Sequence, residues 1–176
     1  MGGEIVRYEP HGMALLESNP GFVETFRKAR CLKFCQQFQG HQVDIAYRFS
    51  INYKRVISKV EDIEFPISKQ SILTTIDIPA QGERLFKGMT VNITQCHDFF
   101  KPKHKDIKLA SGAPRGCMTE DQEKLLRVIQ RYFTCEGLYN MVYLYHVRLL
   151  MHFSGKKALN LPFFLYRSLG KITDKV

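Results

Sequence analysis

Two pairs of side chains have the residue types of metal ligands. Cys31 and Cys35 are four residues apart in a helical pattern, so both thiols fall on one face of that helix. Cys96 and His97 are adjacent and offer a second pair of ligands that zinc accepts. The spacing matches no zinc ribbon, finger or knuckle, and Cys35 also fits the apolar face of its helix. We therefore expect structural, reduced thiols and no metal site.

The apolar stretch "LYNMVYLYHVRLLMHF", residues 138–153, holds His146, Arg148 and His152. The two histidines are six residues apart, about 240° around a helix, so they cannot ligate one metal from that helix alone. The stretch is shorter than the roughly 20 residues needed to cross a bilayer, and Arg148 makes insertion costlier. We predict a helix in the middle of a soluble bundle and no membrane partner.

Enzyme signatures are absent from the sequence. There is no P-loop, dinucleotide fingerprint, G-x-S-x-G or H-E-x-x-H motif. Asp77, Glu83 and Asp98 fall in expected loops, but nothing marks them as a metal-binding trio. Because the chain has five cysteines and six histidines, a Cys/His nucleophile pair can be drawn by chance alone. We predict a protein that is not an enzyme and that needs no cofactor.

Positive charge is concentrated in the second half of the chain. Residues 1–100 hold 12 Lys/Arg against 11 Asp/Glu, whereas residues 101–176 hold 14 against 6. Such a basic half favours nucleic acid or an acidic protein as partner, and the alternative is a solvated surface that aids solubility. The candidate binding residues are Lys101, Lys103, Lys105, Lys108, Arg115, Lys156, Lys157, Arg167 and Lys171.

Aromatic residues suggest a different kind of function. The chain has 13 phenylalanines and eight tyrosines. Phe99, Phe100, Phe163 and Phe164 are candidates for an exposed apolar patch that binds a partner protein or a second copy of the chain. The alternative is that these rings fill the core.

The first half of the chain predicts short elements that position these residues. Residues 1–17 show no clean period and are predicted to be a flexible N-terminal arm. Asn19 and Pro20 suit the start of one amphipathic helix that extends to residue 38. Residues 40–50 alternate like a strand and also fit a short helix, which we favour. β-Branched residues on both sides of a turn predict a β-hairpin near residues 55–67.

Further signals continue along the chain. Ser68 is expected to cap a helix that stops before Pro79, followed by a turn at Gly82 and a short strand over 91–93. Residues 101–117 have two prolines, two glycines and five Lys/Arg, which is typical of a basic loop. Thr119 and Gln122 predict a capping box for a helix that buries Leu125, Ile129, Tyr132 and Phe133, and Pro162 starts the last helix.

Three segments carry a family resemblance: "FPISKQSILTTIDIPAQGERLFKGM", "YFTCEGLYNMVYLYHVRLLMHF" and "LNLPFFLYRSLGKITDKV". With them, roughly residues 20–176 resemble the uncharacterised plant transposon-associated proteins, gag-like reading frames of plant retroelements. The resemblance implies a plant source, descent from a mobile element and a mostly helical module. A gag-like role would imply self-association or nucleic-acid contact. The family has no agreed catalytic residues, so none is carried over.

The expected architecture is mainly α: a single helical domain over 18–176, with five or six helices and the small hairpin. The odd number of cysteines and the lack of an N-terminal apolar signal predict an intracellular protein, nuclear or cytoplasmic. The last helical pattern reaches the final residue without a stop signal. We therefore expect these 176 residues to belong to a longer reading frame.

Overall fold

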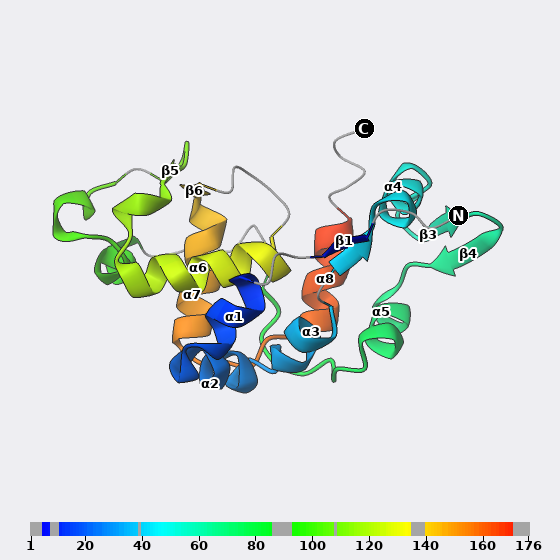
Figure 1. Cartoon of the computed structure of the whole chain (residues 1–176), viewed down its shortest axis with the longest axis horizontal. Coiled ribbons are helices and arrows are strands. Elements are labelled where there is room, and N and C mark those ends of the chain that lie inside the picture. Colours follow the sequence, from blue (N-terminus) through cyan, green and yellow to red (C-terminus); the bar gives the residue numbers. More distant parts are fainter. Residues whose placement is uncertain are drawn as a thin grey trace. The chain divides into compact units, whose positions relative to one another are not determined.

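The computed structural model describes residues 5–7, 11–38, 40–85, 93–107, 109–134 and 140–170 (Figure 1). The protein is mainly helical with a small antiparallel hairpin, as the sequence predicted. In this described part there are eight α-helices rather than five or six. The difference arises because six of them are only six to nine residues long.

The chain divides into two compact units. The bundle unit comprises the described residues of 11–29 and 87–157, and the hairpin unit comprises those of 1–10, 30–86 and 158–176. A single domain over 18–176 stays a prediction. The bundle unit contains α1 (His11–Glu17), α2 (Pro20–Lys28), α6 (Glu120–Tyr132), α7 (Leu144–Ser154), the short strands β5 (Ala113–Pro114) and β6 (Met141–Val142), and three 3-10 helices, η1 (Ile93–Phe99), η2 (Pro102–His104) and η3 (Arg115–Cys117).

The core of the bundle unit lies between α6 and α7, with α1 packed on α6 and α2 on α7. Three phenylalanine rings meet there: the centroid of Phe153 lies 4.7 Å from that of Phe26 and 5.3 Å from that of Phe133. Aromatic pairs at these separations add to the stabilisation from apolar burial. The expected buried stripe of the 119–133 helix is confirmed, because Leu125, Ile129, Tyr132 and Phe133 are all buried.

The flexible arm expected over 1–17 differs from the structure. Residues 11–17 form α1, which packs on α6 and α2, and Leu16 is completely buried. Residues 5–7 form β1 (Ile5–Arg7), which pairs antiparallel with β2 (Gly40–Gln42). A seven-residue helix shows too little periodicity to be recognised in sequence, and its burial depends on partners far along the chain.

The single helix predicted from Pro20 to residue 38 is wrong, because the chain breaks at Arg30. That residue has a left-handed φ of 61° and separates α2 from α3 (Leu32–Gln37). The predicted start is confirmed: the Asn19 side chain accepts hydrogen bonds from the backbone N–H groups of Gly21 and Phe22, and Pro20 is the first helical residue. A left-handed turn without glycine carries no obvious sequence signal.

In the hairpin unit, the preference for a helix after Gly40 is confirmed by α4 (Val43–Ile51). The predicted hairpin is confirmed by β3 (Ile57–Val60) and β4 (Ile63–Pro66), which pair antiparallel with Val60 opposite Ile63. α5 (Lys69–Ile76) begins at Ser68 as predicted, since the Ser68 hydroxyl accepts from the backbone N–H of Ser71. It ends before Pro79, with Asp77 in a left-handed conformation at φ 50°.

The last helix, α8 (Leu161–Leu169), packs on α5. Asn160 joins two segments here, because its Oδ1 accepts from the backbone N–H of Phe163 and its Nδ2 donates to the carbonyl of Ala80. The predicted turn at Gly82 has a φ of 112°, and a Cβ there would lie 2.4 Å from the carbonyl oxygen of Ala158. Only glycine permits this conformation and this close approach.

Two further local predictions differ from the structure. Thr119 precedes α6 but forms no side-chain capping hydrogen bond, so the capping box with Gln122 is wrong. The helix expected over 138–153 is shorter: residues 141–142 form β6, and α7 begins at Leu144. Residues 135–139 lie outside the described part of the chain. Of the predicted strand 91–93, residues 91 and 92 also lie outside it, and Ile93 is the first residue of η1.

Candidate nucleic-acid interface

The basic loop, residues 101–117, is closed at its base by backbone pairing. Phe100 pairs antiparallel with Met118, the N–H of Lys101 donates to the carbonyl of Cys117 at 2.9 Å, and the N–H of Thr119 donates to that of Phe99 at 2.9 Å. Phe100 and Met118 are both buried, so this base is part of the packed interior. The two ends of the loop are therefore held at a fixed separation.

Further contacts hold the loop against the bundle unit. β5 pairs with β6, so that Ala113 lies opposite Val142, and the backbone N–H of Arg115 donates to the carbonyl of Asn140 at 2.8 Å. Leu109 and Ala113, both residues of the loop, are themselves buried. The loop predicted from its prolines and glycines is thus present, but η2, β5 and η3 give it local structure that the sequence pattern did not indicate.

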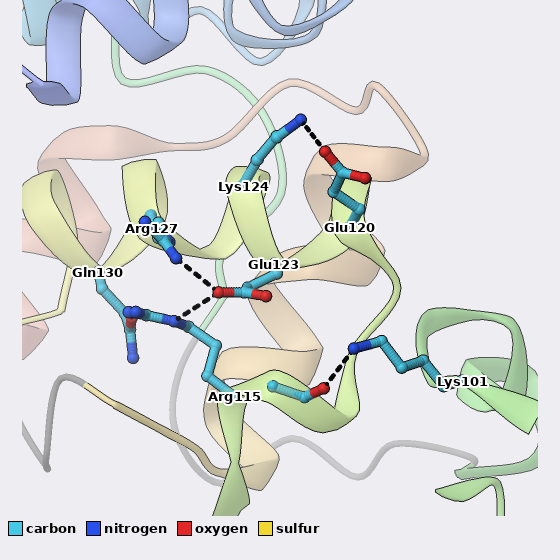
Figure 2. A network of polar contacts seen from close by, with 8 residues as sticks. Lys101, Arg115, Glu120, Glu123, Lys124, Arg127 and Gln130 are labelled. Atoms are coloured by element: carbon cyan, nitrogen blue, oxygen red, sulfur yellow. Dashed lines mark hydrogen bonds and ion pairs between the residues drawn. The ribbon is translucent and has the colours of Figure 1, made fainter. Parts of the chain in front are cut away.

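A polar network joins the loop to α6 (Figure 2). Glu123 Oε1 lies 2.7 Å from Arg127 Nη2 and 3.4 Å from Arg115 Nε. Arg115 Nη1 also donates to Gln130 Oε1 at 3.3 Å, and Gln130 Nε2 donates to the carbonyl of Met141 at 2.9 Å. Only 12% of the Arg115 side chain is exposed. This guanidinium serves to attach the loop, and little of it remains available to a phosphate.

Two carboxylates of the first turn of α6 are held in the charged form. The hydrogen bond from Arg127, with the charges of Arg127 and Arg115, lowers the pKa of Glu123 despite its partial burial. Lys124, whose Nζ lies 2.5 Å from Glu120 Oε1, lowers the pKa of that carboxyl. Anions at this end of the helix also interact favourably with its dipole. The cations of α6 nearest the loop are therefore already neutralised by acids of the same helix.

Three of the predicted binding residues remain together on the exposed side of the loop. Lys101, Lys103 and Lys105 are all exposed. Lys101 Nζ donates to the carbonyl of Gly116 at 2.7 Å, and its charge also contributes to lowering the pKa of Glu120 (Figure 2). Among the described residues, no carboxylate forms an ion pair with Lys103 or Lys105. The three lysines are two residues apart, and η2 forms a single 3-10 turn between the first and the last. Five consecutive residues therefore carry three exposed cationic groups.

The other candidate cations are distributed over the chain. Lys156 and Lys157 are exposed just after α7 in the bundle unit, and Lys156 has a left-handed φ of 52°. Arg167 is exposed on α8 in the hairpin unit. Lys108 and Lys171 lie outside the described residues. The loop lysines are therefore the predicted binding residues that the structure brings together.

The predicted aromatic patch is not strongly exposed. Phe100 is buried, and Phe99, Phe163 and Phe164 are half-buried. Lys69 Nζ and Arg84 Cζ lie 5.5 Å and 5.6 Å from the centroid of the Phe163 ring, in cation–π geometry. The large apolar side chains that are exposed among the described residues lie elsewhere, on α4 and around the hairpin: Ile45, Tyr47, Ile51, Val56, Ile63 and Phe65.

Sequence reasoning missed this second group, although a signal for it was present. Alternating and β-branched residues over 43–66 predicted the hairpin and the ambiguous helix. A two-stranded hairpin with one short helix cannot cover both of its faces, so some of these apolar residues had to remain exposed. Which residues remained exposed depends on how α4 packs on β3.

Burial shifts the pKa values of three thiols and of one histidine. Burial raises the pKa of Cys31, Cys35 and Cys96, which disfavours the reactive thiolate. Burial also lowers the pKa of His146 to about 4, and its Nδ1 accepts from the backbone N–H of Tyr143 at 3.2 Å. Nε2 lies 3.3 Å from the hydroxyl of Thr134, so both ring nitrogens have structural partners. Within the described residues, no cluster of three His, Cys, Asp or Glu side chains could hold a metal ion.

The described helices include none that is both long and apolar enough to span a membrane. No protein-family model, no curated protein and no solved structure matches this chain.

Proposed function

We propose that this chain is a non-enzymatic binding module whose basic loop contacts nucleic acid. The observation that supports the proposal is the exposed group of Lys101, Lys103 and Lys105 on a loop whose two ends are fixed by backbone pairing. Lysines placed in this way reach phosphates without reading base sequence. Because backbone pairing already fixes the two ends of the loop, less conformational entropy is lost on binding than for a disordered tail.

Charge also favours this partner. Residues 101–176 supply eight of the nine net positive charges. Lys124 and Arg127 of α6 pair with acids of that helix, whereas the described residues form no ion pair with Lys101, Lys103 or Lys105. The resemblance to plant retroelement reading frames accords with a nucleic-acid partner, and descent from a transposable element is part of the proposal. An intracellular location, nuclear or cytoplasmic, follows from the same proposal.

The test is fluorescence anisotropy of a labelled single-stranded RNA, repeated with single- and double-stranded DNA, at several KCl concentrations. Each phosphate contact contributes about 0.7 to the slope of log Kd against log salt for a single strand. We expect the double variant Lys103→Gln/Lys105→Gln to weaken binding and to reduce that slope by about 1 to 1.5. Neither substituted amine has a described partner, so the fold should be retained.

The control is Lys54→Gln/Lys59→Gln, which removes two exposed lysines from the hairpin unit and with them the pair of Lys59 with Asp62. It lowers the net charge equally and should leave the slope unchanged. Equal losses in both double variants would indicate net charge alone and would overturn the role of the loop. If poly-glutamate displaced the labelled strand as effectively as unlabelled RNA of equal charge, the partner of the loop would instead be an acidic protein.

A second candidate function is protein binding through apolar side chains, the alternative that the aromatic content of the sequence raised. Six large apolar residues exposed on α4 and around the hairpin favour it. Isolated exposed apolar residues are common in proteins, whereas a group within 21 consecutive residues is typical of an interaction surface.

A further inference from the structure

α4 and the hairpin form one connected piece of the hairpin unit. Ser58 Oγ, fully buried, donates to the carbonyl of Phe49 at 2.6 Å, and Asn52 Nδ2 donates to the carbonyl of Lys59 at 2.9 Å. Arg48 Nη1 lies 3.4 Å from Glu61 Oε1, which links the helix to the hairpin turn. α4 therefore covers the β3 side of the hairpin and holds it in place.

Apolar side chains beside α4 are uncovered, and on β4 they lie on the hairpin face of Ser58, the face that α4 contacts. The exposed fractions are 64% for Tyr47 and 61% for Ile51 on α4, 66% for Val56 before β3, and 62% for Ile63 on β4. Ile63 and Phe65 alternate along β4, so both side chains point to the same face of the hairpin. We call Tyr47, Ile51, Val56, Ile63 and Phe65 the apolar face; Ile45 lies about 200° around α4 from Tyr47 and is not part of it.

The free edge of β4 is poorly suited to the addition of another strand. Residues directly opposite in an antiparallel pair alternate between hydrogen-bonded and non-hydrogen-bonded. The N–H of Ile67 donates to the carbonyl of Val56, which fixes the alternation along β4. The backbone groups of Phe65 and Ile63 are therefore bonded to β3. Those of Glu64 and Pro66 are directed outward. Proline has no N–H, and a charged residue at an edge discourages pairing. A partner of this face must therefore dock on its side chains.

The charge of this segment distinguishes between partners. Residues 43–66 contain four cations and four anions, and their net charge is zero, whereas the whole chain carries +9. The cations are Arg48, Lys54, Arg55 and Lys59, and the anions are Asp44, Glu61, Asp62 and Glu64. A balanced segment attracts neither a strongly acidic nor a strongly basic protein. It is also a place where two copies of a basic chain can meet without mutual repulsion.

We propose that the apolar face docks on the same face of a second copy, forming a two-fold symmetric dimer. In such an isologous contact both copies use the same surface, so each contact between two residues occurs twice. Cations of one copy can therefore face anions of the other. The apolar side chains form the centre of the interface and the eight charged residues form its rim. This inference rests on the second candidate function and is independent of the basic loop.

The test is sedimentation equilibrium of the purified chain from about 1 to 300 μM, a range that detects dissociation constants typical of weak homodimers. The expected mass rises from the monomer value of 20.5 kDa towards twice that value. Ile51→Glu and Ile63→Glu should each raise the dissociation constant at least tenfold, since they place a charge in the interface twice. Both positions are more than half exposed, so circular dichroism should show an unchanged fold.

Two controls make the result specific. Gln70→Glu adds the same charge at an exposed position of α5 outside the apolar face and should dimerise like the wild type. Lys103→Gln/Lys105→Gln should also dimerise normally, even if it no longer binds RNA. A wild-type chain that stays monomeric at the highest concentration overturns the dimer, and so does a dimer that survives both face variants.

Failure of the dimer and failure of protein binding in general are distinguishable. A pull-down with wild-type and Ile63→Glu baits shows whether the face captures any other protein. A monomer whose captured proteins are lost in the Ile63→Glu variant overturns the dimer but leaves the second candidate function in place. A monomer with no such difference overturns both.

Discussion

At the scale of single residues, Arg115 and Arg127 share one acceptor but differ in burial. Arg115 is 12% exposed and attaches the loop to α6 through Glu123 and Gln130, while Arg127 forms an exposed i,i+4 pair with Glu123. We expect Arg115→Met to lower the free energy of unfolding by about 1 to 2 kcal/mol, because a buried charged hydrogen bond is lost. Arg127→Met should cost about 0.5 kcal/mol or less. Urea denaturation of both variants checks the difference, and equal losses would contradict the role assigned to Arg115.

His146 gives the fold a specific pH dependence. Its pKa in the folded protein is about 4, below the ordinary value of 6.5, because burial disfavours the charged ring. The corresponding stability is fully present above pH 6.5 and is lost as the pH falls towards 4, since the unfolded chain then binds the additional proton. We expect the free energy of unfolding to decrease by about 2 kcal/mol between pH 7 and pH 5 on this account.

The measurement is urea denaturation of the wild type and of His146→Gln at both pH values. The variant should be less stable at pH 7 but should show a smaller loss on acidification. This window lies above the range in which the acids with lowered pKa values, Glu120 and Glu123, would take up protons. If the wild type and the variant lost equal stability, the pH dependence would belong to other groups.

At the scale of elements, two segments distant in sequence approach each other closely at Gly82. The backbone N–H of Glu83 donates to the carbonyl of Ala158 at 2.8 Å, and the N–H of Asn160 donates to the carbonyl of Glu83 at 2.9 Å. This parallel bridge joins the segment after α5 to the segment before α8. The three hydrogen bonds of Glu83 and Asn160 thus fix the start of α8 against the loop that carries Gly82.

We expect Gly82→Ala to lower the free energy of unfolding by about 2 to 3 kcal/mol, because its φ is positive and its Cβ would clash with the Ala158 backbone. Gly116→Ala is the matched control, since a Cβ there meets nothing within 4 Å. Thermal denaturation followed by circular dichroism compares the two. If Gly82→Ala melts together with Gly116→Ala, the bridge can adjust and the close approach is not what constrains this position.

The whole molecule separates its charge from its exposed apolar surface. The excess of cations lies in the second half of the sequence, with three exposed lysines on a loop of the bundle unit, whereas the apolar face lies in a neutral segment of the hairpin unit. Added salt should therefore weaken nucleic-acid binding and leave dimerisation nearly unchanged, because counterion release contributes to the former and apolar burial to the latter. The two proposed interactions can be measured independently on one sample.

Features that depend on neighbouring residues could be predicted from the sequence alone. Asn19 with Pro20, Ser68, and the β-branched residues around Glu61–Asp62 predicted helix starts and a hairpin that the structure contains, since caps and turns are settled within a few residues. The periodicity of the 119–133 segment likewise predicted its buried stripe. The basic composition of 101–117 predicted a loop at the right place.

Which of these residues can meet a partner depends instead on long-range packing. Lys103 and Arg115 are both cations of the basic loop. Lys103 is exposed, whereas Arg115 is largely buried against Glu123, because α6 brings an acid next to Arg115 and not next to Lys103. Phe100 is buried while Ile63 is exposed, although both belong to apolar patterns, since burial depends on segments distant along the chain. Local sequence therefore specified the elements, and long-range packing selected the surface.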